Sequence, residues 1–191
     1  RVDESNTMYS EKDCLNPNTI YGCNKLYIEK LGCYYSSLYN QLHKYDYLID
    51  FRSLRFPGLL SCKTTPSGGT SDFIPEMWHA IKNKKTYDCF VEPDTRLPFL
   101  AMPDAINAIE KLMMEKSEKI ISRIYNVNAF NSSADEFYKK LKNHFPNAEI
   151  KYNVNNERQN MVNGWPNNID DSLAKNEWGW KPHFDLDATI N

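Results

Sequence analysis

The sequence predicts an α/β fold, in which helices and strands alternate along the chain. Residues 19–44 contain no proline and carry apolar side chains at helical spacing. A buried strand is predicted directly after them, over residues 47–56, and it ends at Pro57-Gly58. Because a long helix that feeds into a buried strand is half of a parallel α/β unit, we expect a parallel sheet.

Further elements alternate in the same way. Strands are predicted over residues 87–91, 96–102, 123–127 and 150–154, and helices over residues 72–82, 103–116, 133–144 and 170–177. Thr19 is placed to cap the long first helix. Ser133 and Glu136 match a capping box at the start of a later helix. The helix that begins at Asp170-Asp171 is predicted to be the last one.

The composition is that of a globular protein with an ordinary core. The 191 residues are 41% apolar and 25% charged, and the net charge is -2. This charge gives no electrostatic basis for binding nucleic acid or an anionic membrane. No apolar run approaches the ~18 residues that span a bilayer. We therefore expect a protein of the cytoplasm or mitochondrial matrix, with no targeting segment visible at its polar, acidic start.

Cysteine and histidine usage predicts neither disulfides nor a metal site. The five cysteines are widely spaced and none of them form a C-x-x-C pair. The four histidines are isolated and lack metal-ligand spacing. We expect reduced thiols and no bound metal.

The segment Tyr21-Gly22-Cys23-Asn24-Lys25 places a phenol and an ammonium one helical turn apart. Residues i and i+4 share a helix face, so the Lys25 side chain can lie against Tyr21. A cation beside a phenol favours the charged form, and a phenol stabilised in this way can act as a general base near neutral pH. On its own, Y-x-x-x-K is a weak pattern that occurs often by chance, and an ordinary surface pair on a helix is the more common explanation.

The motifs around this pair make the interpretation more specific. In order, the chain carries Y-x-x-x-K at 21–25, Arg-Phe-Pro-Gly at 55–58, Gly-Gly-Thr-Ser-Asp-Phe at 68–73, Pro-Asp-Thr-Arg-Leu-Pro at 93–98, Arg-Ile-Tyr-Asn-Val at 123–127, Trp-Pro at 165–166, Asp-Asp-Ser at 170–172 and Trp-Gly-Trp at 178–180. This series resembles the extended short-chain dehydrogenase/reductase (NAD-dependent epimerase/dehydratase) family, and within it the branch that oxidises L-threonine. The resemblance covers nearly the whole chain from Thr19 onward.

The resemblance implies the C-terminal part of a doubly wound Rossmann-type fold plus a small α/β substrate-binding lobe. Residues 1–66 would form the end of the dinucleotide-binding domain and include the Y-x-x-x-K helix. Residues 67–191 would form mainly the substrate-binding lobe, with some elements returning to the Rossmann sheet. The family's dimers imply a homodimer through the 19–44 helix.

The resemblance also implies NAD as the cofactor and L-threonine as the small-molecule substrate. Tyr21 would take the proton of the secondary hydroxyl as 2-amino-3-oxobutanoate forms. Lys25 would hold the cofactor ribose and stabilise the Tyr21 phenolate, so that both residues are catalytic and cofactor-binding. Phe56, Pro57 and Gly58 would line the nicotinamide side of the pocket.

Five further residues would form the substrate side of the site. Thr70, Ser71 and Asp72 would lie beside the amino acid, with Asp72 a candidate partner of its ammonium group. Trp165 would close the pocket and Arg96 would help to order it. Each has a structural alternative, because Thr70–Asp72 can simply cap the next helix, Arg96 can be structural, and tryptophan more often serves packing.

Two departures from the family limit these assignments. Enzymes of this fold carry G-x-G-x-x-G after the first strand, and none of the seven glycines form that pattern. The family's catalytic serine or threonine would also fall before Arg1. A smaller departure is Pro103, where the family usually has a polar residue.

Two other functions stay open at this point. A nucleotide-sugar epimerase or dehydratase shares Y-x-x-x-K, although the chain lacks a basic cluster for a diphosphate and its 68–73 and 165–172 segments argue against this function. An inactive remnant that acts only by dimerisation is the second alternative.

Overall fold

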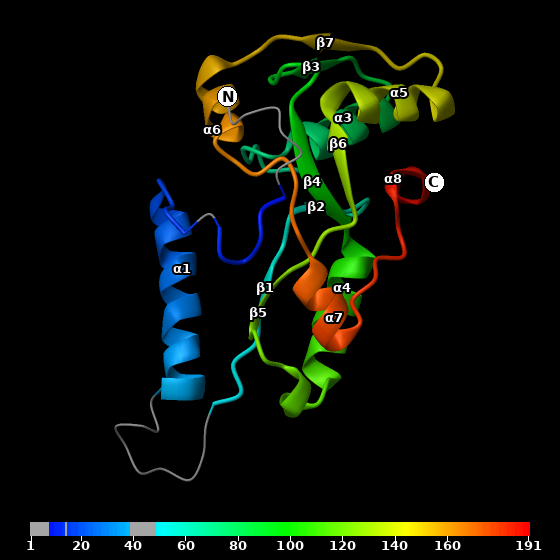
Figure 1. The fold of residues 1–191 in the computed structure, drawn as a ribbon. Helices are drawn as coiled ribbons and strands as arrows, with labels where there is room; N and C mark the ends of the chain where they lie inside the picture. Colours follow the sequence, from blue (N-terminus) through cyan, green and yellow to red (C-terminus); the bar gives the residue numbers. More distant parts are fainter. Residues whose placement is uncertain (1–7, 14, 39–48) are drawn as a thin grey trace.

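The computed structural model describes residues 8–13, 15–38 and 49–191, in which helices and strands alternate as predicted (Figure 1). The elements are α1 (Ile20–Cys33), which continues as a π-helical turn (Tyr34–Leu38), β1 (Ser53–Arg55), β2 (Gly58–Leu60), α3 (Phe73–Lys82), β3 (Tyr87–Cys89), β4 (Arg96–Ala101), α4 (Met102–Met114), a 3-10 turn (Ser117–Lys119), β5 (Ile124–Asn126), β6 (Phe130–Ser133), α5 (Ala134–His144), β7 (Ile150–Tyr152), α6 (Asn156–Asn163), α7 (Ser172–Trp178) and α8 (Leu186–Ile190).

Parallel pairing dominates the strands, as the predicted α/β fold requires. β1 pairs parallel with β5, with Leu54 opposite Tyr125. β2 pairs parallel with β4, and β3 pairs parallel with β7. β6 runs antiparallel to β4 on its other side, so β4 is the central strand of a three-stranded sheet.

Two groups of buried side chains form the interior. The first, which we call the lobe core, lies between α3, α5 and the strands β3 and β4, and includes Phe73, Met77, Phe99, Phe137 and Leu141. The second, which we call the sheet core, lies under α4 and α7 beside β5, and includes Leu100, Leu112, Tyr125, Trp178 and Trp180. Figure 1 shows α3 and α5 near one end of the molecule and α4 and α7 near the other. β4 contributes to both cores, because Phe99 points into the first and Leu100 into the second.

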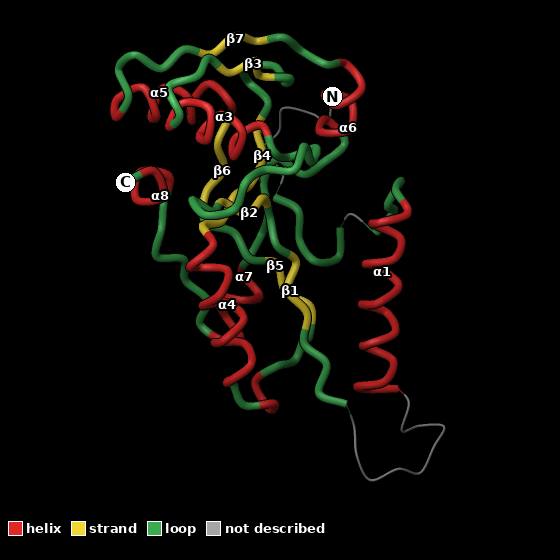
Figure 2. Tube along the Cα trace, turned by 180° about the vertical axis from the view of Figure 1, so that it is seen from behind, coloured by secondary structure: helices red, strands yellow, loops and turns green. Residues whose placement is uncertain are grey.

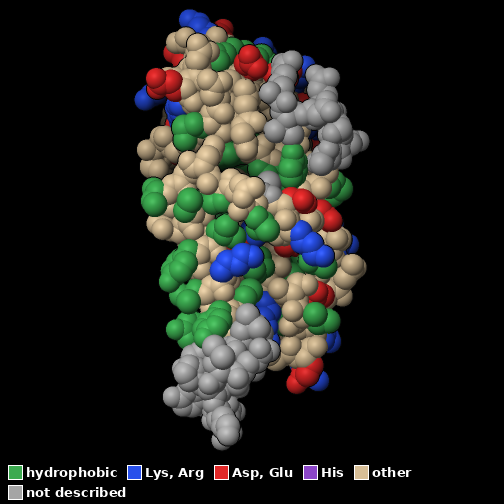
Figure 3. Space-filling model, turned by 60° about the vertical axis from the view of Figure 1, so that its left-hand side comes forward, with side chains coloured by type: hydrophobic (Ala, Val, Ile, Leu, Met, Phe, Trp, Pro, Cys, Tyr) green, Lys and Arg blue, Asp and Glu red, His purple; other side chains and the backbone are tan. Residues whose placement is uncertain are grey.

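Helix α1 stands apart from both cores in the two ribbon views (Figures 1 and 2). As predicted, Thr19 caps it: the Thr19 hydroxyl accepts a hydrogen bond of 3.1 Å from the Gly22 amide. Among the described side chains of α1, only Glu29 is buried. Space filling shows hydrophobic side chains exposed on the side of the molecule that α1 occupies (Figure 3).

The predicted elements after residue 56 are present with bounds that differ by one or two residues, and the strands β2 and β6 and the helices α6 and α8 were not predicted. The predicted helical residues 39–44 and the first two residues of the predicted 47–56 strand lie outside the described residues. β2 begins at Gly58, where Pro57-Gly58 indicated that the strand should end. The sequences of β6 and α6 are mostly polar, with three asparagines in α6, and they resemble loops. Since α8 follows α7, the prediction that the 170–177 helix is the last one was wrong.

Across the described ranges, no helix is both long and apolar enough to cross a membrane. Nor does any group of three or more His, Cys, Asp or Glu side chains in those ranges come together in a way that could hold a metal ion.

Candidate functional site

The predicted tyrosine–lysine pair forms on α1. The Lys25 ammonium lies 5.3 Å from the centroid of the Tyr21 ring, a distance at which a cation is attracted to the ring face. Tyr21 is 69% exposed. Lys25 is exposed as well and forms no ion pair with a carboxylate of the described residues. The phenol and the ammonium are therefore close together and accessible to a ligand.

A paired arginine and glutamate fix α1 to the body of the molecule. The Arg55 guanidinium donates two hydrogen bonds to the Glu29 carboxylate, of 2.8 and 2.7 Å. Arg55 is the last residue of β1 and also donates to the Glu11 carbonyl. The Glu11 carboxylate in turn accepts from the Asn126 amide at 2.8 Å, and burial raises the pKa of this carboxyl. Glu29 lies one turn beyond Lys25, so this pairing fixes the face of α1 that carries Tyr21 and Lys25.

The Phe56-Pro57-Gly58 turn leads from β1 into β2, directly after Arg55. Gly58 is required by close packing, because a Cβ atom here would come within 2.7 Å of the Phe99 ring. Phe56 is 37% exposed. The turn thus starts at the point where α1 is tied to the sheet, which is where the resemblance places the nicotinamide.

Asp72 folds back on the loop that precedes α3. Its Oδ2 atom accepts hydrogen bonds from the Ser67 amide at 3.1 Å and from the Gly69 amide at 2.8 Å. It occupies the N-cap position of α3, but its side chain makes no capping hydrogen bond to that helix. The structural alternative thus holds for the position of Asp72, which is the N-cap residue, although its side chain does not make the capping bond. No hydrogen bond to Oδ1 occurs within the described part of the chain, which leaves this oxygen available.

Arg158 on α6 holds the same loop and was not predicted. Its guanidinium donates to the Gly69 carbonyl at 2.6 Å and to the Gly68 carbonyl at 3.3 Å. The same group lies 3.2 Å above the centre of the Phe90 ring. Gly68 has a φ of +87°, a conformation that favours glycine. These contacts connect the 67–72 loop to α6, and the chain leaves α6 at Gly164 to reach Trp165.

Arg96 is the first residue of β4, and its side chain is engaged within the lobe. It donates to the Asn131 carbonyl at 2.9 Å and pairs with the Glu136 carboxylate. This pairing holds the pKa of Glu136 below its usual value. Glu136 is the residue that closes the capping box with Ser133. Arg96 therefore orders the start of α5.

The structure brings some of the predicted residues together and leaves others apart. Tyr21 and Lys25 are in contact, and the 70–72 loop is connected to α6 and to the segment that carries Trp165. Trp165 is 38% exposed. In the portion of the chain that is described, no hydrogen bond or ion pair joins Tyr21 or Lys25 to Asp72 or Trp165.

Comparison with known proteins adds the family. The sequence profile of the NAD-dependent epimerase/dehydratase family matches residues 2–128, which is more than half of the chain. The chain belongs to this family. The match includes the Tyr21–Lys25 pair, the Arg55–Gly58 turn and β5.

Individual members of the family agree with this assignment. The mitochondrial L-threonine 3-dehydrogenase of Bos taurus is 39% identical over 175 residues, which are 91% of this chain and 44% of that protein. The structure of L-threonine 3-dehydrogenase from Trypanosoma brucei has a TM-score of 0.81 at 35% identity, covering 92% of this chain and 52% of that one. The holo form of the GalE-like L-threonine dehydrogenase from Cupriavidus necator has a TM-score of 0.81 at 35% identity, covering 92% and 54%.

These matches confirm the predicted family and fold class, and they show how much of each relative this chain covers. The family is NAD-dependent, and its solved members share the α/β arrangement of this chain. The chain spans about half the length of the relatives it matches.

The residues of this family member fit one part of an NAD molecule. The Lys25 ammonium lies over the Tyr21 ring and donates no hydrogen bond within the described residues, and its three donors suit the vicinal hydroxyls of a ribose. The pyrophosphate has no counterpart in this sequence, because none of its seven glycines form the G-x-G-x-x-G turn. The fit is thus to the nicotinamide riboside end of the cofactor.

Proposed function

We propose that this chain belongs to an NAD-dependent L-threonine 3-dehydrogenase, which oxidises the secondary hydroxyl of L-threonine to 2-amino-3-oxobutanoate. The observation that carries the proposal is the accessible contact between the Tyr21 ring and the Lys25 ammonium. The Bos taurus and Trypanosoma brucei relatives are L-threonine 3-dehydrogenases, which supports the choice of substrate. In this proposal residues 1–66 complete a dinucleotide-binding domain, and residues 67–191 form mainly the substrate lobe.

Tyr21 is the general base of the proposed reaction. When bound, NAD supplies the acceptor for the hydride that leaves C3 of the substrate. The Tyr21 oxygen takes the proton of the substrate hydroxyl, so one proton and one hydride leave together and a ketone remains. Lys25 places a positive charge beside the Tyr21 ring and donates hydrogen bonds to the ribose hydroxyls.

The 70–72 loop is proposed to bind the amino acid end of the substrate. Within the described residues the Oδ1 atom of Asp72 accepts no hydrogen bond, while Oδ2 is held by two backbone amides. A carboxylate fixed in this way suits the substrate ammonium. Thr70 and Ser71 supply hydroxyls beside it, and Trp165 covers the site. Arg96 acts indirectly, by ordering α5 through Glu136.

The central experiment measures NADH formation at 340 nm with L-threonine and NAD⁺. It compares the 191-residue chain with the longest product of the gene, and with Tyr21→Phe in whichever of them is active. We expect Tyr21→Phe to lower kcat about a thousandfold while the Kd for NAD stays within a factor of two, because general-base catalysis contributes about 10² to 10⁴. Near-normal turnover of this variant contradicts the assignment of Tyr21 as the base.

Lys25→Met tests the second half of the pair. It removes the charge beside the phenol and the donors to the ribose, so both kcat and the affinity for NAD are expected to fall. Lys30→Met is the matched control, because Lys30 is an exposed lysine on the same helix. A normal Kd for NAD in Lys25→Met would contradict the ribose role.

We also propose a homodimer through the 19–44 helix. The described part of α1 exposes Ile20, Tyr27, Ile28 and Leu31, and an exposed apolar surface of this kind is typical of an association site. Ile28→Glu is expected to shift the mass measured by light scattering from dimer to monomer. If no product of the gene oxidises threonine but this dimer forms, the inactive-remnant function replaces the dehydrogenase.

For the compartment we propose the mitochondrial matrix or the cytoplasm, and the name of the Bos taurus relative favours the former.

A further inference from the structure

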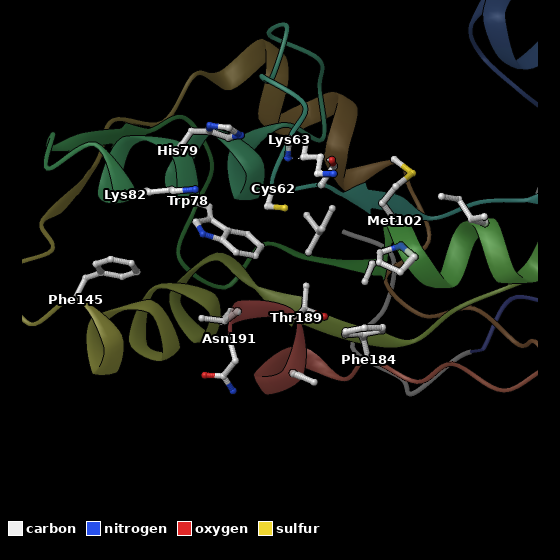
Figure 4. A pocket seen from close by; sticks show the side chains of 17 residues that line it. Cys62, Lys63, Trp78, His79, Lys82, Met102, Phe145, Phe184, Thr189 and Asn191 are labelled. Carbon is white, nitrogen blue, oxygen red and sulfur yellow. Dashed lines mark hydrogen bonds between the residues drawn. The ribbon is translucent and has the colours of Figure 1, made fainter.

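A cavity of about 630 Å³ opens between α3, α4 and α8, on the side of the molecule away from α1 (Figures 1 and 4). Its walls come from the segment after β2, from α3, from the β4–α4 junction, from Phe145 after α5 and from the C-terminal segment. None of the residues predicted for the dehydrogenase site line it. Its volume lies in the range of about 300 to 1,000 Å³ that is typical of small-molecule sites.

The interior of this cavity is aromatic and aliphatic. Trp78 projects from α3 toward α8, and Phe145 and Phe184 lie at opposite sides of the view in Figure 4. Ile106, on the first turns of α4, lines the cavity and is 51% exposed. These side chains expose an apolar surface to water. An apolar ligand that covers this surface would bind favourably, because burying apolar surface lowers the free energy.

The charged side chains of the lining are all basic. Lys63 follows β2 and Lys82 ends α3, and both are exposed. Neither lysine pairs with a carboxylate among residues 8–13, 15–38 and 49–191, and no Asp or Glu side chain lines the cavity. His79 also contributes to the lining, but its Nε2 atom lies 3.0 Å from the Thr64 carbonyl and is engaged there. Asn191 also lines the cavity, and in the 191-residue chain its α-carboxylate offsets one of the two positive charges, so the described lining keeps a net positive charge.

We propose that this cavity binds a small amphipathic carboxylate, with its apolar body against Trp78 and its carboxylate at Lys63 and Lys82. An apolar wall alone would accept neutral ligands equally well, and lysines alone would accept any anion. The combination selects a molecule that carries both features. The proposal does not depend on the dehydrogenase function, because it involves other residues on another side of the molecule.

Octanoate is the probe for the first test, with isothermal titration calorimetry of the 191-residue chain at low salt as the measurement. Octyltrimethylammonium is the matched control, since it has the same apolar tail and the opposite charge. We expect octanoate to bind at one site and the cation to bind at least tenfold more weakly. Equal binding of the two, or no binding of octanoate, overturns the proposal.

Variants locate the site. Lys63→Gln combined with Lys82→Gln is expected to weaken octanoate about tenfold, because two partly screened charge contacts are lost. Lys85→Gln, at an exposed lysine outside the lining, should leave the Kd unchanged. Ile106→Trp fills the cavity and should abolish binding, whereas Ile109→Trp on the same helix, outside the lining, should not. Unchanged affinity in the double lysine variant contradicts the proposal even if Ile106→Trp does not fold.

Cys62 provides an independent readout in the unmodified protein. Its thiol lines the cavity beside Trp78 and is exposed, and Cys23 on α1 is an exposed thiol far from it. Saturating octanoate should slow the alkylation of Cys62 by iodoacetamide at least threefold, as followed by peptide mass spectrometry, and leave Cys23 unaffected. Equal rates at Cys62 with and without octanoate would place the ligand elsewhere and overturn the assignment.

Discussion

Helix α1 differs from the helices α3 and α5 of the lobe in the kind of side chain that it buries. α3 buries Phe73, Ile74, Met77 and Ile81, and α5 buries Phe137 and Leu141. α1 is longer than either, yet among its described side chains it buries only Glu29. Since most helix stability in proteins comes from the packing of an apolar face, the lobe is stabilised by its own side chains. α1, which carries the proposed base, is joined to β1 by the Glu29–Arg55 ion pair and packs closely against the Phe51 ring at Gly32.

The largest expected difference between the two regions concerns buried apolar side chains. Phe99→Ala empties the centre of the lobe core, where the Phe99 ring packs edge-on against Phe73 at 6.1 Å. We expect it to lower the free energy of unfolding by about 3 to 5 kcal/mol in urea denaturation. Ile28→Ala on α1 should change it by less than about 0.5 kcal/mol. A comparable loss at Ile28 would show that α1 is packed as firmly as the lobe.

The ion pair between α1 and β1 is the next largest contribution. Glu29→Gln leaves the Arg55 guanidinium without its carboxylate, and the two side chains are 10% and 24% exposed. We expect a loss of about 2 kcal/mol, together with faster amide hydrogen exchange along α1 than in α5. Glu110→Gln, at an exposed glutamate of α4, is the control. In an active form of the protein kcat should fall in Glu29→Gln, and the double charge reversal Glu29→Arg with Arg55→Glu should restore part of it.

Helix caps allow the same comparison at smaller scale. Ser133→Ala removes one half of the capping box of α5 and should lower the unfolding free energy by about 1 kcal/mol. Thr19→Ala removes the corresponding bond of α1. α1 buries few apolar side chains. Thr19→Ala should therefore speed amide hydrogen exchange in the first turn of α1 and leave the urea midpoint of unfolding nearly unchanged. A full cap effect on the midpoint would show that α1 unfolds together with the lobe.

The smallest expected effect is a difference in pH response. The hydrogen bond from Arg96 lowers the pKa of Glu136, so its stabilisation of the lobe is present above the unfolded pKa of about 4.3 and is lost as the pH falls through the folded value. Burial raises the pKa of Glu11 beside β1. Its contribution has the opposite sign, being most favourable at low pH and lost as the pH rises through the folded value. Arg96→Gln should therefore make the free energy of unfolding depend less on pH in the acid range. Glu11→Gln should raise the free energy of unfolding slightly near pH 7.

Local signals in the sequence predicted most of the fold. The Thr19 cap and the Ser133–Glu136 capping box depend on residues three apart, and both are present as predicted. β6 was missed because Asn131-Ser132-Ser133 is polar, although it pairs with the central strand β4. α6 was missed for the same reason, and its capping residue Asn155 resembles a loop residue until the Arg158 amide is placed against it.

The contacts of the candidate site likewise fall into local ones, which the sequence predicted, and long-range ones, which it did not. The contact between Tyr21 and Lys25 follows from helical spacing and was predicted. The clamp of Arg158 on the Gly69 carbonyl and the pairing of Glu29 with Arg55 join residues far apart in the sequence. No periodicity or short motif reports such a contact, so they could be found only in the folded molecule.

The exposed side of β1 has a practical consequence for handling the protein. Within the described residues, β1 has a strand neighbour only on the side of β5. The amide and carbonyl groups of an open strand edge pair with whatever strand arrives first, whether it comes from a longer product of the gene or from another copy. Purity and storage concentration would then decide between correct assembly and aggregation. A short peptide that adds one strand to this edge is expected to lower the aggregation that light scattering detects at high protein concentration.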